Sequence, residues 1–212
     1  MTRATLIDAR SVGGVPERLV EDRDLEADVT RALGVLNDVI RVHRIAADDP
    51  ALVPLTRSRV TVTRVGIGAG DLVADGRWDH AVTLPPAPTA RGRTALEPTQ
   101  RLAAVLGGRD VVLACEVLVL RAREDADAGR WREAAFQLRV GLEAALAEFA
   151  PWAGQGDIDA RISELRSLRE ATGALANGAL ERGLDDAQIG QARNVLERLE
   201  SALRSRAALA CA

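Results

Sequence analysis

The last quarter of the chain contains the pattern that most constrains its fold. Apolar residues recur there at alternating intervals of three and four positions. These residues are Ile189, Ala192, Leu196, Leu199 and Leu203. This spacing places them along one side of an α-helix and is typical of helices that pack as in coiled coils. Such a helix needs a partner for its apolar side, so the pattern predicts helical packing.

The segment before this helix is a candidate partner within the same chain. It also has apolar residues at helical intervals, and they are Ile158, Ile162, Leu165, Leu168 and Leu175. We expect Asn177-Gly178 to end this helix in left-handed backbone geometry. Asp185, with Gln188 three residues later, resembles a capping box at the start of the last helix. The short connection predicts an antiparallel hairpin.

The apolar stripe of the last helix has two interpretations. It belongs to the core if it closes against Ile162 and Leu165 of the same chain. Alternatively, Leu196, Leu199 and Leu203 form a surface that binds a partner protein or a second copy of the chain. The sequence leaves both alternatives open.

Further helices are expected before this hairpin. Pro98 suits a first helical turn, and Gly107-Gly108 ends that helix. Another helix is expected from Trp131 to about Phe149, where Pro151 follows it. Together with the hairpin, these segments predict a bundle of four to five helices.

The segment between these two helices is ambiguous. Asp110 can cap a helix that starts after it. The apolar run Val111–Leu120 fits either a helix or a buried strand. We favour a helix, because the run continues without a breaker as far as Ala126.

The first part of the chain changes its period. A helix is expected over Asp24–Ala47, where one side is apolar. Alternating β-branched residues then predict a strand over Arg59–Val65 and a second over Trp78–Leu84. Asp75-Gly76 is a hairpin signal between them. The sequence therefore predicts a small antiparallel sheet that packs on the helix, since so small a sheet is marginal alone.

A proline-rich segment separates the two parts. Pro85-Pro86-Ala87-Pro88 has the composition of an extended connector. We predict a helix and a small β-sheet over residues 1–84, a Pro/Arg/Gly connector over residues 85–97, and a helical bundle over residues 98–212. The fold class is mainly α, with a small antiparallel β element in the N-terminal part.

The composition excludes several kinds of chemistry. All 28 basic residues among the 212 are arginine, and the chain has no lysine. This excludes a phosphate-binding P-loop lysine and Schiff-base chemistry. The net charge is −3 and there are only five aromatic residues, so we expect no nucleic-acid partner.

The cysteines and the apolar runs bear on the compartment. Cys115 lies in an apolar run and Cys211 is the penultimate residue, so neither is part of a metal-binding or disulfide framework. No apolar run is long enough to span a membrane. We therefore expect a cytoplasmic protein with no membrane segment, no metal and no cofactor.

One glycine-rich segment follows the first predicted strand. Gly66, Gly68 and Gly70 precede Asp71, a charge that a dinucleotide-binding loop would not tolerate beside the pyrophosphate. A looser anion site fits better. In that interpretation the glycine amides hold a phosphate and nearby arginines supply positive charge. Those arginines are Arg57, Arg59 and Arg64.

The chain has two histidines. His43 continues the apolar side of the first helix, which favours a structural role. His80, beside Asp79, is the best candidate for a general base. No nucleophile motif accompanies it, so we assign no catalytic residue.

One segment resembles a known family. The run over residues 129–142 has a glycine, an aromatic residue two positions later, Glu-Ala, and then large and small apolar residues at helical intervals. It comprises Gly129, Arg130, Trp131, Arg132, Glu133, Ala134, Ala135, Leu138, Gly141 and Leu142. Together with Leu118 and Ala122, this run resembles one tetratricopeptide-repeat hairpin over about residues 115–146. Arg121 and Asp125 depart from the pattern, and no second copy follows. The resemblance implies a role in protein interaction.

Two functions follow from these observations. The first is an interaction or assembly protein that acts through helical hairpins and binds a protein partner or a second copy. The alternative is an anion- or nucleotide-binding protein, with or without catalysis, that uses the basic glycine-rich segment 57–80.

Overall fold

The computed structural model describes residues 3–9, 14–85 and 97–211. It divides the chain into two compact units, Met1–Arg93 and Thr94–Ala212. Most of the predicted connector, residues 86–96, lies outside the described residues. We describe each unit by itself.

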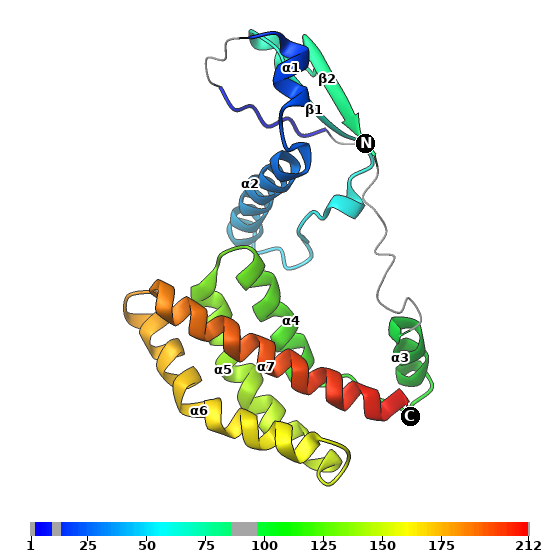
Figure 1. Ribbon diagram of the computed structural model, residues 1–212, viewed down its shortest axis with the longest axis vertical. Coiled ribbons are helices and arrows are strands. Elements are labelled where there is room, and N and C mark those ends of the chain that lie inside the picture. The colour runs from blue at the N-terminus through cyan, green and yellow to red at the C-terminus, as the bar shows by residue number, and fades with distance from the viewer. Residues whose placement is uncertain (1–2, 10–13, 86–96, 212) are drawn as a thin grey trace. The chain divides into compact units, whose positions relative to one another are not determined.

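The second unit is a helical bundle (Figure 1). Its helices are α3 (Glu97–Leu106), α4 (Ala114–Asp127), α5 (Trp131–Glu148), α6 (Ile158–Glu181) and α7 (Asp186–Cys211), with a 3₁₀ turn η3 (Ala150–Trp152) after α5. Helices α4 and α5 form one antiparallel hairpin, and α6 and α7 form another. The predicted fold class, mainly α with a small β element and a C-terminal helical bundle, is confirmed.

One apolar core holds this bundle together. Its large, fully buried members come from α5, from the residue that follows it and from α6 and α7, and they are Leu138, Leu142, Phe149, Ile158, Leu165, Leu175, Val195, Leu196 and Leu199. Small residues allow close approach elsewhere. A side chain at Gly141 of α5 would lie 3.4 Å from both Leu118 and Val119 of α4. The helices of the bundle therefore bury much of their apolar surface against one another.

The first unit combines two helices with a two-stranded sheet. Its elements are α1 (Pro16–Glu21), α2 (Leu25–Ala46), η1 (Arg57–Arg59), β1 (Thr63–Ile67), η2 (Asp71–Val73) and β2 (His80–Leu84). The strands are antiparallel, and Val65 lies opposite Val82. Helix α1, which the sequence did not predict, packs against both strands, while α2 contacts β1.

The first strand differs from its prediction. Arg59 ends a 3₁₀ turn and β1 begins only at Thr63, so a strand over Arg59–Val65 was wrong at its start. The connection to β2 is also longer than a tight hairpin. It contains η2, and Gly76 adopts a positive φ of 78°. Alternation of β-branched residues cannot locate a strand end when a local turn competes for the same residues.

The end of α6 also differs from its prediction. Asn177-Gly178 lies inside the helix, which continues to Glu181 and ends before Gly183 at φ 87°. Gly178 has a packing role instead. A side chain there would lie 3.2 Å from the side-chain nitrogen Nε2 of Gln188, at the start of α7. Gly178 therefore lies at the contact between α6 and the beginning of α7.

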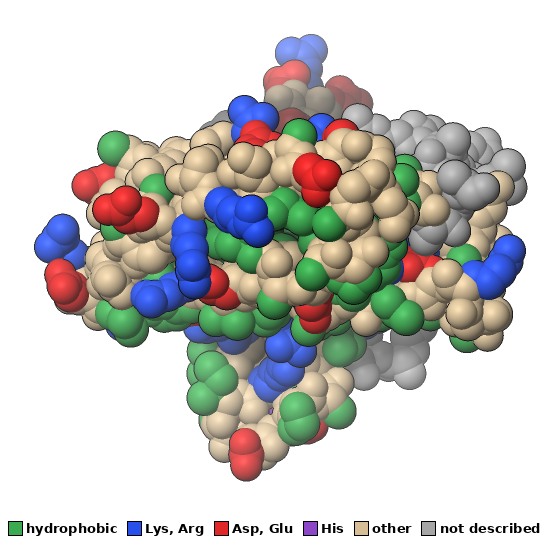
Figure 2. Space-filling model, turned by 90° about the horizontal axis from the view of Figure 1, so that it is seen from below, with side chains coloured by type: hydrophobic (Ala, Val, Ile, Leu, Met, Phe, Trp, Pro, Cys, Tyr) green, Lys and Arg blue, Asp and Glu red, His purple; other side chains and the backbone are tan. Residues whose placement is uncertain are grey.

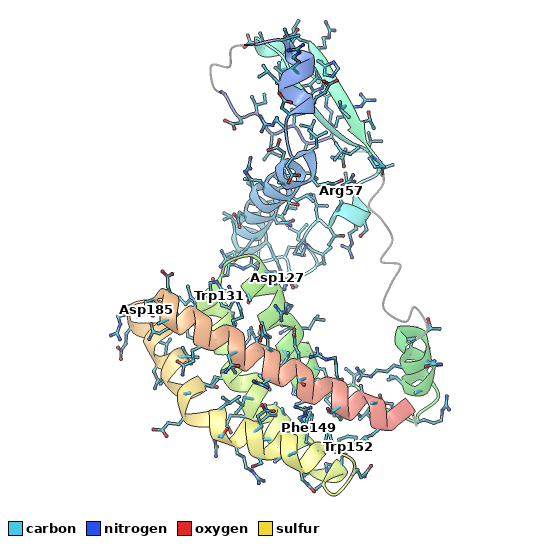
Figure 3. The ribbon with its side chains drawn as sticks, viewed as in Figure 1. Arg57, Asp127, Trp131, Phe149, Trp152 and Asp185 are labelled. Atoms are coloured by element: carbon cyan, nitrogen blue, oxygen red, sulfur yellow. The ribbon has the colours of Figure 1, made fainter. Side chains whose placement is uncertain are left out.

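The start of α4 corrects a further prediction. Asp110 does not cap the helix, because α4 begins at Ala114 after three residues without regular secondary structure. The helical interpretation of Val111–Leu120 is confirmed from Ala114 onward. Asp185 and Gln188 do form the expected reciprocal cap: the Gln188 amide donates to Asp185 Oδ1 (2.8 Å), and the Asp185 amide donates to Gln188 Oε1 (3.0 Å). Asp185 marks this turn in Figure 3.

Candidate interaction surface

Helix α2 is well defined by its own sequence. The Ala27 amide donates to Asp24 Oδ1 over 3.0 Å, so Asp24 caps the first turn. Glu26 and Asp28 place negative charge at the positive end of the helix dipole. Asp48 adopts a positive φ of 50° just after the helix ends.

Helix α2 buries few of its side chains against the rest of the first unit. Val29 is its only buried residue. Farther along, the Asn37 side chain holds the following segment: its Nδ2 donates to the Leu55 carbonyl (3.0 Å), and the Leu55 amide donates to its Oδ1 (2.7 Å). These contacts occupy one side of α2 and leave another side open.

The open side carries apolar residues at alternating intervals of three and four. We call these residues the α2 seam, and they are Ala32, Val35, Val39, Val42 and Ala46. The three valines are 49 %, 62 % and 62 % exposed in chain order. A surface helix normally buries such a stripe. Within the first unit, the α2 seam is therefore a surface that lacks a partner among the described residues.

Charged, polar and apolar residues flank the α2 seam. Arg31 and Asp38 precede seam residues along one edge, and Leu36 and His43 follow seam residues along the other. Arg31 Nη1 bonds Asp28 Oδ1 over 3.0 Å. Hydrogen bonds from Arg23 hold the pKa of the Asp28 carboxyl below its ordinary value. The N-terminal end of the seam is therefore bounded by a paired charge.

The predicted interaction residues of the last helix lie elsewhere. Leu196 and Leu199 are both fully buried, and Leu203 is half-buried against the same core. Ile162 and Leu165 of α6 belong to that core as well. The structure thus places these three leucines on the intramolecular side of the two alternatives. We call the stripe from Ile189 to Leu203 the α7 seam.

The α7 seam continues to a buried charge that the sequence analysis did not identify. Arg206, three positions after Leu203, is fully buried. Its Nη2 lies 2.5 Å from Asp110 Oδ1 and donates to the Val111 carbonyl over 3.3 Å. Its guanidinium also stacks 4.3 Å from the centre of the Trp152 ring. Extending the three-four spacing by one step would have located this residue.

Two further charges close the cluster around Arg206. Arg101 of α3 contacts Asp110 Oδ2 (3.2 Å) and Glu116 Oε1 (2.5 Å). Glu116 Oε2 also accepts the Leu113 amide at the start of α4. The cluster joins α3, α4 and α7, and Trp152 covers it near Phe149 at the end of α5 (Figure 3). The two arginines of the cluster balance its two carboxylates, which suits a structural role.

Two carboxyl groups near this cluster are held ionised. Burial raises the pKa of Asp110, but hydrogen bonds from Arg206, the Val111 amide and Arg101 outweigh it, and the pKa lies below its ordinary value. Glu148 behaves likewise, because its oxygens accept the Ala114 and Cys115 amides. Burial and the contact with Glu148 raise the pKa of the Cys115 thiol, which disfavours its thiolate form.

The arginines proposed for an anion site have other partners or point away. Arg57 Nη2 donates to the Pro85 carbonyl over 2.5 Å, and its Nε lies 3.9 Å from Glu26 (Figure 3). Arg64 Nε donates to Thr83 Oγ1 on the exposed face of the sheet. Arg59 is exposed at the end of η1.

Packing accounts for two of the three glycines. A side chain at Gly66 would lie 2.7 Å from the His80 carbonyl oxygen, and one at Gly68 would lie 2.8 Å from Val73. Gly66 belongs to β1 rather than to a loop. Gly70 adopts a positive φ of 73° and has open space around it. These positions give no sign of a phosphate cradle.

His80 lies on the other face of the sheet from Arg64. The register pairs His80 with Ile67 and Arg64 with Thr83. Positions 80, 82 and 84 of β2 share the more buried face, and positions 81 and 83 are exposed. Asp79 is exposed, and the described structure has no side-chain hydrogen bond between it and His80. The structure therefore does not bring the anion-site and general-base candidates together.

The described residues show no other constellation for chemistry. No group of His, Cys, Asp or Glu among them could hold a metal ion. No described helix combines the length and apolar character that a membrane span requires. On the face in Figure 2, acidic and basic side chains are scattered among apolar ones.

Comparisons with known proteins add no relationship. No protein-family model, no curated protein and no solved structure matches this chain.

Proposed function

We propose that this protein is an interaction or assembly protein whose docking surface is the α2 seam. The carrying observation is the exposure of Val35, Val39 and Val42 on a three-four spacing along one helix. A contiguous exposed apolar stripe marks a protein-interaction site in many folded proteins. A partner helix with a matching apolar side fits it best.

The energetics support this proposal. Burying one valine side chain contributes roughly 1.5 kcal/mol or more. Three valines with two alanines can therefore offset part of the cost of association, although lost translational freedom opposes it. Helix α2 also gains, because most helical stability in proteins comes from packing of an apolar side.

The helical bundle fits the same kind of function. The α4–α5 hairpin has the segment that resembles a tetratricopeptide repeat, a family that acts through protein interaction. Val117 and Leu120 of α4 and Val140 of α5 are exposed there. They are secondary candidates, because fewer of them share one helix side than in the α2 seam.

A site-specific photo-crosslinker tests the proposal in the full chain. We expect a discrete adduct when the crosslinker replaces Val39, and none when it replaces Val53, an equally apolar residue that is 54 % exposed outside the seam. The adduct at position 39 should disappear when Val42→Asp is added, because the charge disrupts the seam. Equal crosslinking at both positions, or none at position 39, would refute the proposal.

A further inference from the structure

We infer that the occupant of the α2 seam is the α2 seam of a second copy of this chain, paired in parallel and in register. This inference rests on the proposed function and names its partner. Three features of the helix support it: the composition of the seam, its two ends, and the charges on its edges.

The seam is self-complementary in composition. In coiled-coil terms, Val39 occupies an a position, and Val35 and Val42 occupy d positions. Ala32 and Ala46 extend the same line by one step at each end. In a parallel pair each residue meets its own copy, so valine meets valine and alanine meets alanine. None of the five is polar, so pairing buries no unmatched charge.

The ends of the seam limit the pairing to this region. The next position toward the N-terminus is Asp28, which Arg23 binds through two hydrogen bonds of 2.6 and 2.8 Å. Toward the C-terminus the helix ends at Ala46. The paired segment spans 15 residues, or about 22 Å of helix. This short length predicts a weak, concentration-dependent assembly.

The edge charges favour the parallel arrangement. In a parallel pair, a residue just before an a position faces the residue five positions later on the other helix. Asp38 then faces His43 of the second copy, and symmetry repeats this contact. In the antiparallel arrangement that sets Val39 against Val35, Asp38 instead faces Asp38 of the second copy. Like charges oppose that alternative.

Sedimentation of the full chain tests self-association. We expect the average mass to rise towards that of a dimer over about a hundredfold increase in concentration. A trimer mass would overturn the inference, because the inference specifies the pairing of two seams. Val39→Asp should give a monomer throughout, and Val53→Asp should behave as the unmodified chain.

A charge exchange tests the orientation. Asp38→Arg combined with His43→Arg places like charges opposite each other in the parallel pair, so we expect about fivefold weaker association than for the unmodified chain. Asp38→Arg combined with His43→Glu should instead restore association, because opposite charges then face each other. If the Arg–Glu variant associates as weakly as the Arg–Arg variant, the parallel register is wrong.

The outcomes separate this inference from the proposed function. A chain that stays monomeric but crosslinks at position 39 to a protein of different mass overturns self-pairing and keeps the docking function. A monomer without such an adduct overturns both. If the chain is monomeric and Val39→Asp lowers its melting temperature, the seam is covered within the chain. That result also overturns self-pairing.

Discussion

Helices α2 and α7 carry apolar residues at the same three-four spacing, but the two seams have opposite burial. Leu196 and Leu199 of the α7 seam are fully buried, whereas Val39 and Val42 of the α2 seam are each 62 % exposed. The helices are of similar length, at 22 residues for α2 and 26 for α7. Spacing alone therefore does not explain the difference.

The surroundings of the two helices explain it. Helix α7 packs against α4, α5 and α6, each of which contributes apolar residues to one core. The first unit has only four buried apolar side chains among its described residues, Val20, Val29, Val73 and Leu84. A three-four spacing specifies a surface that needs a partner, and the supply of other apolar surfaces decides whether the same chain provides it.

The largest effect on stability is expected at the buried charge of Arg206, which follows the α7 seam. Asp110→Ala removes the carboxylate that pairs with the buried Arg206, and we expect a loss of about 3–5 kcal/mol in the free energy of unfolding. Urea unfolding, followed by helical circular dichroism, measures it. Asp127→Ala is the control, because that carboxylate is exposed and its contact with Arg123 is 3.6 Å long. Equal losses in both variants would show that the buried cluster does not stabilise the bundle.

A direct comparison of the two seams should give the next largest effect. Leu199→Ala leaves a cavity in the core and should cost about 3 kcal/mol. Val39→Ala should cost less than about 0.5 kcal/mol in dilute protein, since the side chain is largely exposed. The same unfolding measurement checks both. A comparable loss at Val39 would mean that the α2 seam is covered in the monomer.

The smallest effect is expected from acid, and on the α7 side of the comparison it acts through Asp110 and Glu148. Asp110 and Glu148 have folded-state pKa values below their ordinary values, so their ionised forms stabilise the fold. This stability is complete above the unfolded pKa values, near 4, and is lost as pH falls through the lower folded values. The melting temperature should therefore fall on acidification below about pH 4.

The pH effect has a matched control. Glu148→Gln cannot ionise, so it should start with a lower melting temperature at neutral pH and lose less on acidification. The α2 seam contains no carboxyl group, and we expect Val39→Ala to follow the acid response of the unmodified chain. An unchanged acid response in Glu148→Gln would remove this carboxyl from the explanation.

Local signals predicted the helices well and some of their ends poorly. The reciprocal bonds of Asp185 and Gln188 form as expected, because a cap involves residues only three positions apart. The prediction for Gly178 was wrong, because the sequence does not distinguish a glycine at a contact between helices from a glycine that ends a helix. The prediction for Asp110 was wrong because its buried partner Arg206 lies in the last helix, far from it in the sequence.

The candidate interaction surface was likewise predicted only in part. An apolar side of the first long helix was predicted, but only His43 on it was given a role, which was structural, and the interaction residues were placed in the last helix. The spacing of apolar residues could not have shown which of the two helices is exposed, because both helices have the same three-four pattern. The anion-site candidates were neighbours in sequence, and the antiparallel register then placed Arg64 and His80 on opposite faces.

Amino-acid order thus accounts for the helical class of this protein, for the spacing of both seams and for the absence of lysine chemistry. These are properties of short segments or of composition, so no partner is needed to define them. Tertiary structure decided which seam is covered, and it buried Arg206 at the end of one of them. Burial depends on which distant segments meet, because a charge or an apolar stripe is stable only beside groups that complement it.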